Sequence, residues 1–241
     1  MKLTTTIALT TIFSAAIGQA SFAQSPKVIL ERTAHVYANK SAVKAVMDMH
    51  MTLGPMGTIG TKSVIYQSGG KKYRVETTML PGPMAAKVGQ NANTLMVATG
   101  KYLYMYRPAM NQYSVFPENK PGVGGGPMQS PSQSLMSASG LKKMEATVVG
   151  PAKMVSFDNI PCWAIATRSK MANQIVTVYI ARSSYLVKGV TMVMNYGKMN
   201  MSMKALFTSV SFPKSLPASL FTFTPPKGAV KMATVMPGGM P

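Results

Sequence analysis

The stretch that decides the fold is VKAVMDMHMT, residues 43–52. Every second side chain in it is apolar, and these side chains are Val43, Ala45, Met47, Met49 and Met51. The residues between them are mostly polar or charged, with Val46 as the exception. Because successive side chains of a strand point to opposite faces, this two-residue period predicts a strand with one apolar face.

Similar segments follow along the first half of the chain. Turn residues separate them, and the predicted strands are 62–67, 73–78, 94–99, 102–107 and 112–116. Short turns between neighbouring strands favour an antiparallel meander. Ahead of these strands, Ser25-Pro26 is a helix-start signal, and it predicts a helix over 26–38.

The second half of the chain is also rich in strand patterns. The predicted strands are 143–149, 162–168, 174–180, 186–195, 199–212 and 220–223. Between the halves, residues 117–134 are rich in Gly, Pro and Ser and predict a loop, followed by a short helix over about 132–138 that Gly140 ends. Since no change of composition divides the chain, we expect one domain over 24–231, mainly β with few helices.

The two ends of the sequence predict export and a disordered tail. Lys2, the apolar segment 3–17 and the small residues of 20–23 form the pattern of a secretory signal peptide over 1–23, cut before Gln24. We therefore expect a periplasmic protein, and it is not itself a lipoprotein because no cysteine lies near the cut. The Met- and Gly-rich residues 232–241 are predicted to be disordered.

The charge balance is strongly basic. The chain has 25 Lys and Arg residues against 6 Asp and Glu residues, a formal net charge of +19. Such a surface attracts polyanions, although high charge also simply favours solubility. For an exported chain an anionic membrane surface is the nearer partner, and we expect no nucleic-acid partner. The single cysteine, Cys162, lies beside Trp163 in an apolar run and is predicted to be a buried, inert thiol.

The titratable residues argue against catalysis. The two histidines are His35, in the predicted first helix, and His50, in the first strand. Asp48 is the one acid close to a histidine, and no nucleophile accompanies that pair. The sequence also lacks a P-loop, zinc-ligand spacing and a serine nucleophile elbow. We therefore expect no enzymatic activity and no cofactor.

Methionine is the unusual component, with 23 residues in all. Several alternate along predicted strands, so that each group shares one face: Met47, Met49 and Met51; Met192 and Met194; Met199, Met201 and Met203. Methionine is a flexible apolar residue suited to surfaces that accept varied ligands, and its thioether also binds Cu(I). We predict that these eight residues line an apolar cavity. Plain core packing and a copper site remain open alternatives.

The order of the elements resembles a known superfamily. The motifs are KYRVE at 72–76, VATGKYLYMYRP at 97–108, NQY at 111–113, IPCW at 160–163, VTVYI at 176–180, LP at 216–217 and LFTFTPPKGA at 220–229. They resemble the outer-membrane lipoprotein carriers (LolA and LolB) and their uncharacterised periplasmic relatives, over about residues 26–231.

The resemblance implies a fold and a class of ligand. It implies a single curved antiparallel sheet, an unclosed half-barrel, with helices on its concave side. It also implies an apolar cavity that accepts acyl chains, so the expected partner is a lipid or an acylated protein, bound by a monomer. Two other functions stay open: a basic module that docks on the envelope without a cavity, and a Met-rich Cu(I)-binding protein.

Overall fold

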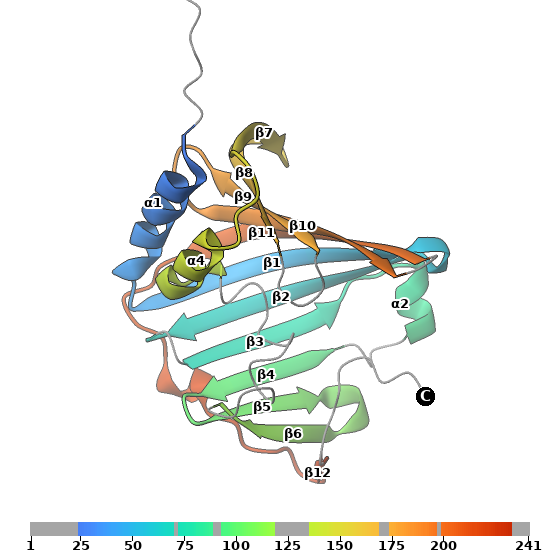
Figure 1. Cartoon of the computed structure of the whole chain (residues 1–241). Coiled ribbons are helices and arrows are strands. Elements are labelled where there is room, and N and C mark those ends of the chain that lie inside the picture. The colour runs from blue at the N-terminus through green and yellow to red at the C-terminus, as the bar shows by residue number, and fades with distance from the viewer. Residues whose placement is uncertain are drawn as a thin grey trace, which may run out of the picture.

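The computed structural model describes residues 24–69, 72–88, 93–118, 135–168, 174–196 and 199–232. Within these residues, twelve strands form one unclosed sheet (Figure 1). The predicted fold class, mainly β with few helices in a single unclosed sheet, is confirmed. The predicted signal peptide 1–23, the tail after Met232 and most of the loop 117–134 lie outside the described residues.

The first half of the chain forms the antiparallel meander that its pattern predicts. Its strands are β1 (Ala42–Leu53), β2 (Thr58–Ser68), β3 (Lys72–Met79), β4 (Thr94–Thr99), β5 (Tyr102–Arg107) and β6 (Gln112–Pro117). The short helices between them are η1 (Gly54–Met56), α2 (Pro83–Val88) and η3 (Pro108–Met110). Gly57, after η1, has a φ of 106°, a left-handed conformation that glycine adopts without steric cost.

The second half returns across the other side of β1. Its strands are β7 (Lys153–Phe157), β8 (Ile160–Arg168), β9 (Ile175–Ala181), β10 (Val187–Tyr196) and β11 (Met199–Ser211). The last of these, β11, pairs with β1, so the strand order is β12-β6-β5-β4-β3-β2-β1-β11-β10-β9-β8-β7. This order places β1 and β11 in the middle of the sheet, where the methionine pattern is densest.

Two helices pack on one face of the sheet, which we call the inner face. They are α1 (Pro26–Ala38), as predicted, and α4 (Ala138–Glu145) (Figure 1). From α1, Ile29 and Leu30 are buried against the sheet, and from α4, Leu141 is. Side chains of the inner face, such as Ile65, Ile165 and Phe207, complete this core and are at most 1% exposed.

The structure corrects the prediction around α4. The first three residues of the strand predicted over 143–149 are the end of this helix, and Gly140 lies inside the helix rather than ending it. The Ser137 side chain accepts a hydrogen bond from the Gly140 N–H at 3.1 Å and so caps the first turn. Beyond the helix, Val148 makes an isolated bridge with Thr167.

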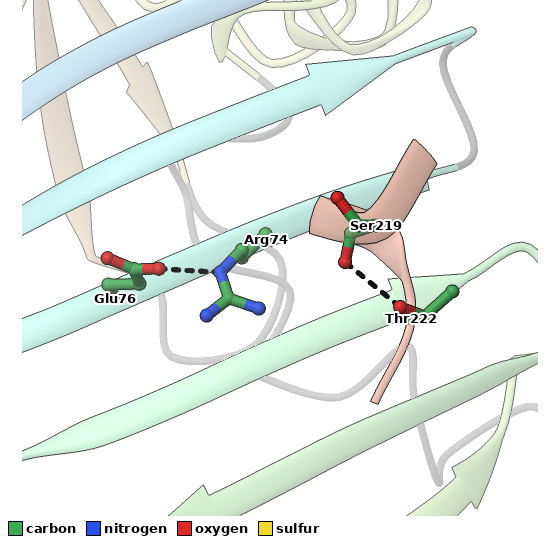
Figure 2. A network of polar contacts seen from close by, with 4 residues as sticks. All are labelled: Arg74, Glu76, Ser219 and Thr222. Atoms are coloured by element: carbon green, nitrogen blue, oxygen red, sulfur yellow. Dashed lines mark hydrogen bonds and ion pairs between the residues drawn. The ribbon is translucent and has the colours of Figure 1, made fainter. Parts of the chain in front are cut away.

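A C-terminal segment, which we call the strap (residues 213–232), crosses the outer face. Instead of the strand predicted over 220–223, it forms η4 (Ala218–Phe221) and then β12 (Val230–Lys231), which pairs with β6 in parallel. Figure 2 shows η4 passing over the sheet near Arg74, whose Nε lies 2.6 Å from a Glu76 carboxylate oxygen.

Aromatic packing holds the strap in place. The Phe223 ring lies 5.1, 6.0 and 5.8 Å from the rings of Tyr104, Tyr106 and Tyr113. The alternating tyrosines of β5 therefore pack under the strap, and this leaves the inner face as the place to look for a binding site. Among the described helices, none is long and apolar enough to cross a membrane.

Candidate binding site on the inner face of the sheet

The methionines of β1 lie on the inner face, in three different environments. Met47 is buried, 8% exposed, within the core beneath the helices. Met49 is half-buried and packs against that core. Met51 is also half-buried but lies beyond the core residues. Along one strand face, contact with the helix-covered core therefore decreases from Met47 to Met51.

Strand register brings methionines from three strands together. Met51 of β1 lies opposite Met203 of β11, which lies opposite Met192 of β10. Side chains at such directly opposite positions have Cβ atoms roughly 4.5–5.5 Å apart, close enough for their thioethers to touch. Met201 follows on the same face, opposite Leu53. We call Met51, Met192, Met201 and Met203 the methionine end of the inner face.

Two of the predicted residues continue this pattern in the backbone. Met194 lies opposite Met201, and Met199 lies opposite Tyr196, at the end of the β10–β11 hairpin. Both occupy register positions on the inner face, while their side chains lie outside the described part of the structure.

A β-bulge sets which residues of β11 face inward. Val46 pairs with Ser209, whereas the next residue, Met47, pairs with Phe207, so Thr208 is the additional residue. A bulge shifts the alternation by one position. Consequently Phe207 and Val210 both pack in the inner core.

Sequence reasoning missed further methionines on the inner face. Met79, Met96 and Met105 belong to β3, β4 and β5, and register places Met96 opposite both Val75 and Met105. Met105 is 4% exposed and packs in a second small core with Leu103. Each is a single methionine in its strand, so no alternating triplet marked it. For Met96 and Met105 the available signal was an apolar residue two positions away, Ala98 and Leu103.

Hydroxyl groups interrupt the apolar surface at β2 and β3. Ser63 and Thr77 are hydrogen-bonded across the strands at 2.9 Å. Thr61 lies between Met49 and Met79 in the register, and its buried Oγ1 has no hydrogen-bond partner among the described residues. A buried hydroxyl without a partner is unfavourable, so Thr61 offers a polar contact to a ligand on this face.

The described residues show no cluster typical of a metal site. In that part of the chain, His, Cys, Asp and Glu form no group of three that could hold a metal ion. His35 lies on α1, whereas His50 lies on β1, where it alternates with the inward methionines. Cys162 is fully buried, and burial raises the pKa of its thiol above the ordinary value. A thiol with a raised pKa is a poor nucleophile, as predicted from its apolar neighbours.

Comparisons with known proteins agree with this fold. Residues 128–235 match a family described as a predicted periplasmic protein (DUF2092). No curated protein sequence matches the chain. An uncharacterized conserved protein from Thermus thermophilus is similar in structure, with 15% identity and a TM-score of 0.53, covering 88% of this chain and 100% of that chain.

Two other similar structures bear names from the superfamily that the sequence resembles. A LolA superfamily protein from Nitrosomonas europaea has 9% identity and a TM-score of 0.39, covering 83% of this chain and 99% of that chain. A putative outer membrane lipoprotein-sorting protein domain from Vibrio parahaemolyticus has 12% identity and a TM-score of 0.40, covering 82% of this chain and 95% of that chain. At such identities the likeness concerns the fold alone.

Proposed function

We propose that this chain is an exported, non-catalytic protein that binds an acyl chain at the methionine end of its inner face. The single observation that supports this most is the register of Met51, Met203 and Met192 across three neighbouring strands, beyond the helix-covered core. All three side chains are apolar and flexible. Met51 and Met192 are half-buried on either side of the buried Met203. The expected ligand is a lipid or the acyl group of an acylated protein.

The chemistry of the side chains supports an apolar ligand of variable shape. Methionine has an unbranched side chain with three rotatable bonds, so it adjusts to varied ligand shapes at little cost. Half-buried Met51, Met192 and Met201 therefore present a surface that a ligand can cover. Covering this apolar surface contributes roughly 25 cal/mol for each Å² removed from water.

A Cu(I) site is the second candidate, and the same register favours it. Three thioethers on directly opposite positions of adjacent strands can converge on one soft cation. The two proposals differ in what they need from the side chains. Acyl binding needs apolar surface, whereas copper binding needs sulfur.

Two matched variants separate these functions. Met51→Leu/Met192→Leu keeps the apolar surface and removes two sulfur atoms. Met51→Gln/Met192→Gln keeps side-chain length and makes the surface polar. We expect uptake of a fluorescent fatty acid by the wild-type protein and the Leu variant, and weaker uptake by about tenfold or more in the Gln variant, equivalent to about 1.4 kcal/mol. Val193→Gln, at the exposed neighbouring position of β10, is the control.

The outcomes decide between the candidates. Loss of Cu(I) binding in both double variants, with no fatty-acid uptake by any form, would establish the copper function instead. Uptake that is equal in the Gln variant and the Val193→Gln control would place the ligand elsewhere and overturn the proposal. Native mass spectrometry of the gently purified protein identifies any lipid that co-purifies.

A further inference from the structure

A pocket lies at the other end of β10 from the methionine end. It has a volume of about 360 Å³ and is formed where the β9–β10 turn approaches the start of α1. Its lining residues come from three segments and are Gln24, Pro161, Trp163, Arg182, Ser183 and Tyr185. About seven residues of β10 separate Tyr185 from Met192, or roughly 23 Å of extended chain, so this pocket is distinct from the methionine end.

Tyr185 is held in a strained conformation that directs it towards α1. Its φ is +55°, which is unusual for a bulky residue. Its N–H donates to the Ala181 carbonyl oxygen at 2.9 Å, and Arg32 of α1 donates from Nη1 to the Tyr185 hydroxyl at 2.7 Å. Backbone strain of this kind persists where the surrounding contacts maintain it, and it concentrates at binding sites.

Two arginines lie over aromatic rings rather than beside carboxylates: Arg182 lines the pocket, and Arg32 of α1 adjoins it through Tyr185. The Arg182 guanidinium carbon lies 5.1 Å from the Trp163 ring centre, and that of Arg32 lies 5.5 Å from the Tyr185 ring centre. Among the described residues, the ion pairs are Lys27 with Glu145 and Arg74 with Glu76, so neither Arg32 nor Arg182 has an acidic partner there. Both arginines are exposed.

We propose that this pocket binds a phosphate group, an inference that goes beyond acyl-chain binding. A guanidinium group donates in a fork that matches phosphate oxygens; Arg182 supplies one in the pocket lining, and Arg32 adds a second positive charge beside Tyr185. The hydroxyl groups of Ser183 and Tyr185 lie at the same pocket and add polar contacts. The basic net charge of +19 raises the local concentration of anions around the site. The phosphate comes either from a lipid head group or from a soluble phosphate compound.

Trp163 makes the proposal testable, because it is the only tryptophan of the chain. Its ring contacts Arg182, so a phosphate that engages Arg182 changes its fluorescence. In a titration with inorganic phosphate at constant ionic strength, we expect a saturable change for the wild-type protein. The phosphate concentration at half of the full change, the midpoint, is expected to rise about tenfold or more in Arg32→Gln/Arg182→Gln, because this variant loses charge-assisted hydrogen bonds.

Controls separate binding from folding and from general charge. Lys143→Gln/Lys214→Gln removes the same charge from exposed positions outside the pocket and is expected to keep the wild-type midpoint. Tyr185→Phe keeps the ring and removes the hydroxyl, and it is expected to give a smaller increase in the midpoint. The urea-unfolding midpoint of each variant shows that it is folded.

Vesicles identify the source of the phosphate. Phosphatidylglycerol vesicles are compared with phosphatidylcholine vesicles in the same fluorescence titration. If phosphatidylglycerol changes Trp163 fluorescence with the same dependence on Arg32 and Arg182, and phosphatidylcholine changes it much less, the phosphate belongs to an anionic lipid head group. If inorganic phosphate saturates the site and vesicles have no effect, it belongs to a soluble compound. The absence of a saturable change, or equal midpoints for the arginine variant and the lysine control, overturns the proposal.

Discussion

Beneath α1 and α4 the inner face of the sheet forms the main hydrophobic core, whereas at the methionine end most side chains of the same strands are only half-buried. The central strand β11 contains both situations on one face. Phe207 is 1% exposed, Met203 is 8% exposed, and Met201 is half-buried. Side-chain chemistry changes along with burial, from aromatic to thioether.

This difference suggests that two parts of one sheet have different roles. Aromatic and β-branched side chains have few rotamers and specify a single packing, which stabilises the fold. Methionine side chains retain alternative rotamers and adapt to what covers them. The packed half is therefore expected to supply stability, and the methionine end is expected to supply binding.

The largest expected effect is on stability in the packed half. Phe207→Ala removes a fully buried ring and is expected to lower the free energy of unfolding by about 3–5 kcal/mol, because a cavity remains. Met201→Ala on the same strand face is expected to cost less than about 1 kcal/mol, since its side chain is already partly in water. Urea unfolding of the two variants measures both values. Equal losses of unfolding free energy in the two variants would contradict the difference in role between the packed half and the methionine end.

Much of the fold could be predicted because local patterns agree with it. The alternation in 43–52 and the glycine turns of the hairpins gave the strands β1 to β6. Local patterns failed where distant contacts decide the structure. The helix α4 depends on Leu141 being buried beneath α1, and η4 depends on Phe221 and Phe223 packing on the outer face.

The candidate site was predictable only in part. Alternation identified the inward methionines of β1, β10 and β11, but register across strands cannot be obtained from one segment alone. Thus the core position of Met47 and the alignment of Met51, Met203 and Met192 emerged only in the structure. The pocket proposed to bind phosphate was not predicted, because Arg32, Trp163 and Arg182 are far apart in sequence.

The second prediction, with a smaller expected effect, tests whether water is excluded from the packed half. Tyr37 of α1 is 4% exposed, and burial raises the pKa of its hydroxyl from 10.0 to about 12. The unfolded chain therefore loses this proton first, near pH 10. The contribution of Tyr37 is fully present below pH 10 and is lost as the pH rises towards 12, by on the order of 3 kcal/mol.

The measurement is the free energy of unfolding of the wild-type protein and Tyr37→Phe between pH 9 and pH 12. All other titratable groups are the same in both proteins, so the difference in slope belongs to Tyr37. Tyr37→Phe also removes the acceptor of the Val187 N–H, which lies 3.3 Å from the hydroxyl oxygen, and this lowers stability at every pH. Parallel curves would show that water reaches Tyr37 and that the packed half is not dry.

The smallest expected effect connects the two regions through ligand binding. A fatty acid present at about ten times its dissociation constant should stabilise the wild-type protein by about 1.4 kcal/mol, since it binds only the folded chain. Phe207→Ala should gain the same increment from its lower starting stability. Met51→Gln/Met192→Gln should start near wild-type stability and gain little. Because one variant loses stability and keeps binding while the other does the reverse, the pair measures each function independently. If Phe207→Ala abolished the increment and the Gln variant kept it, the ligand would bind within the helix-covered core.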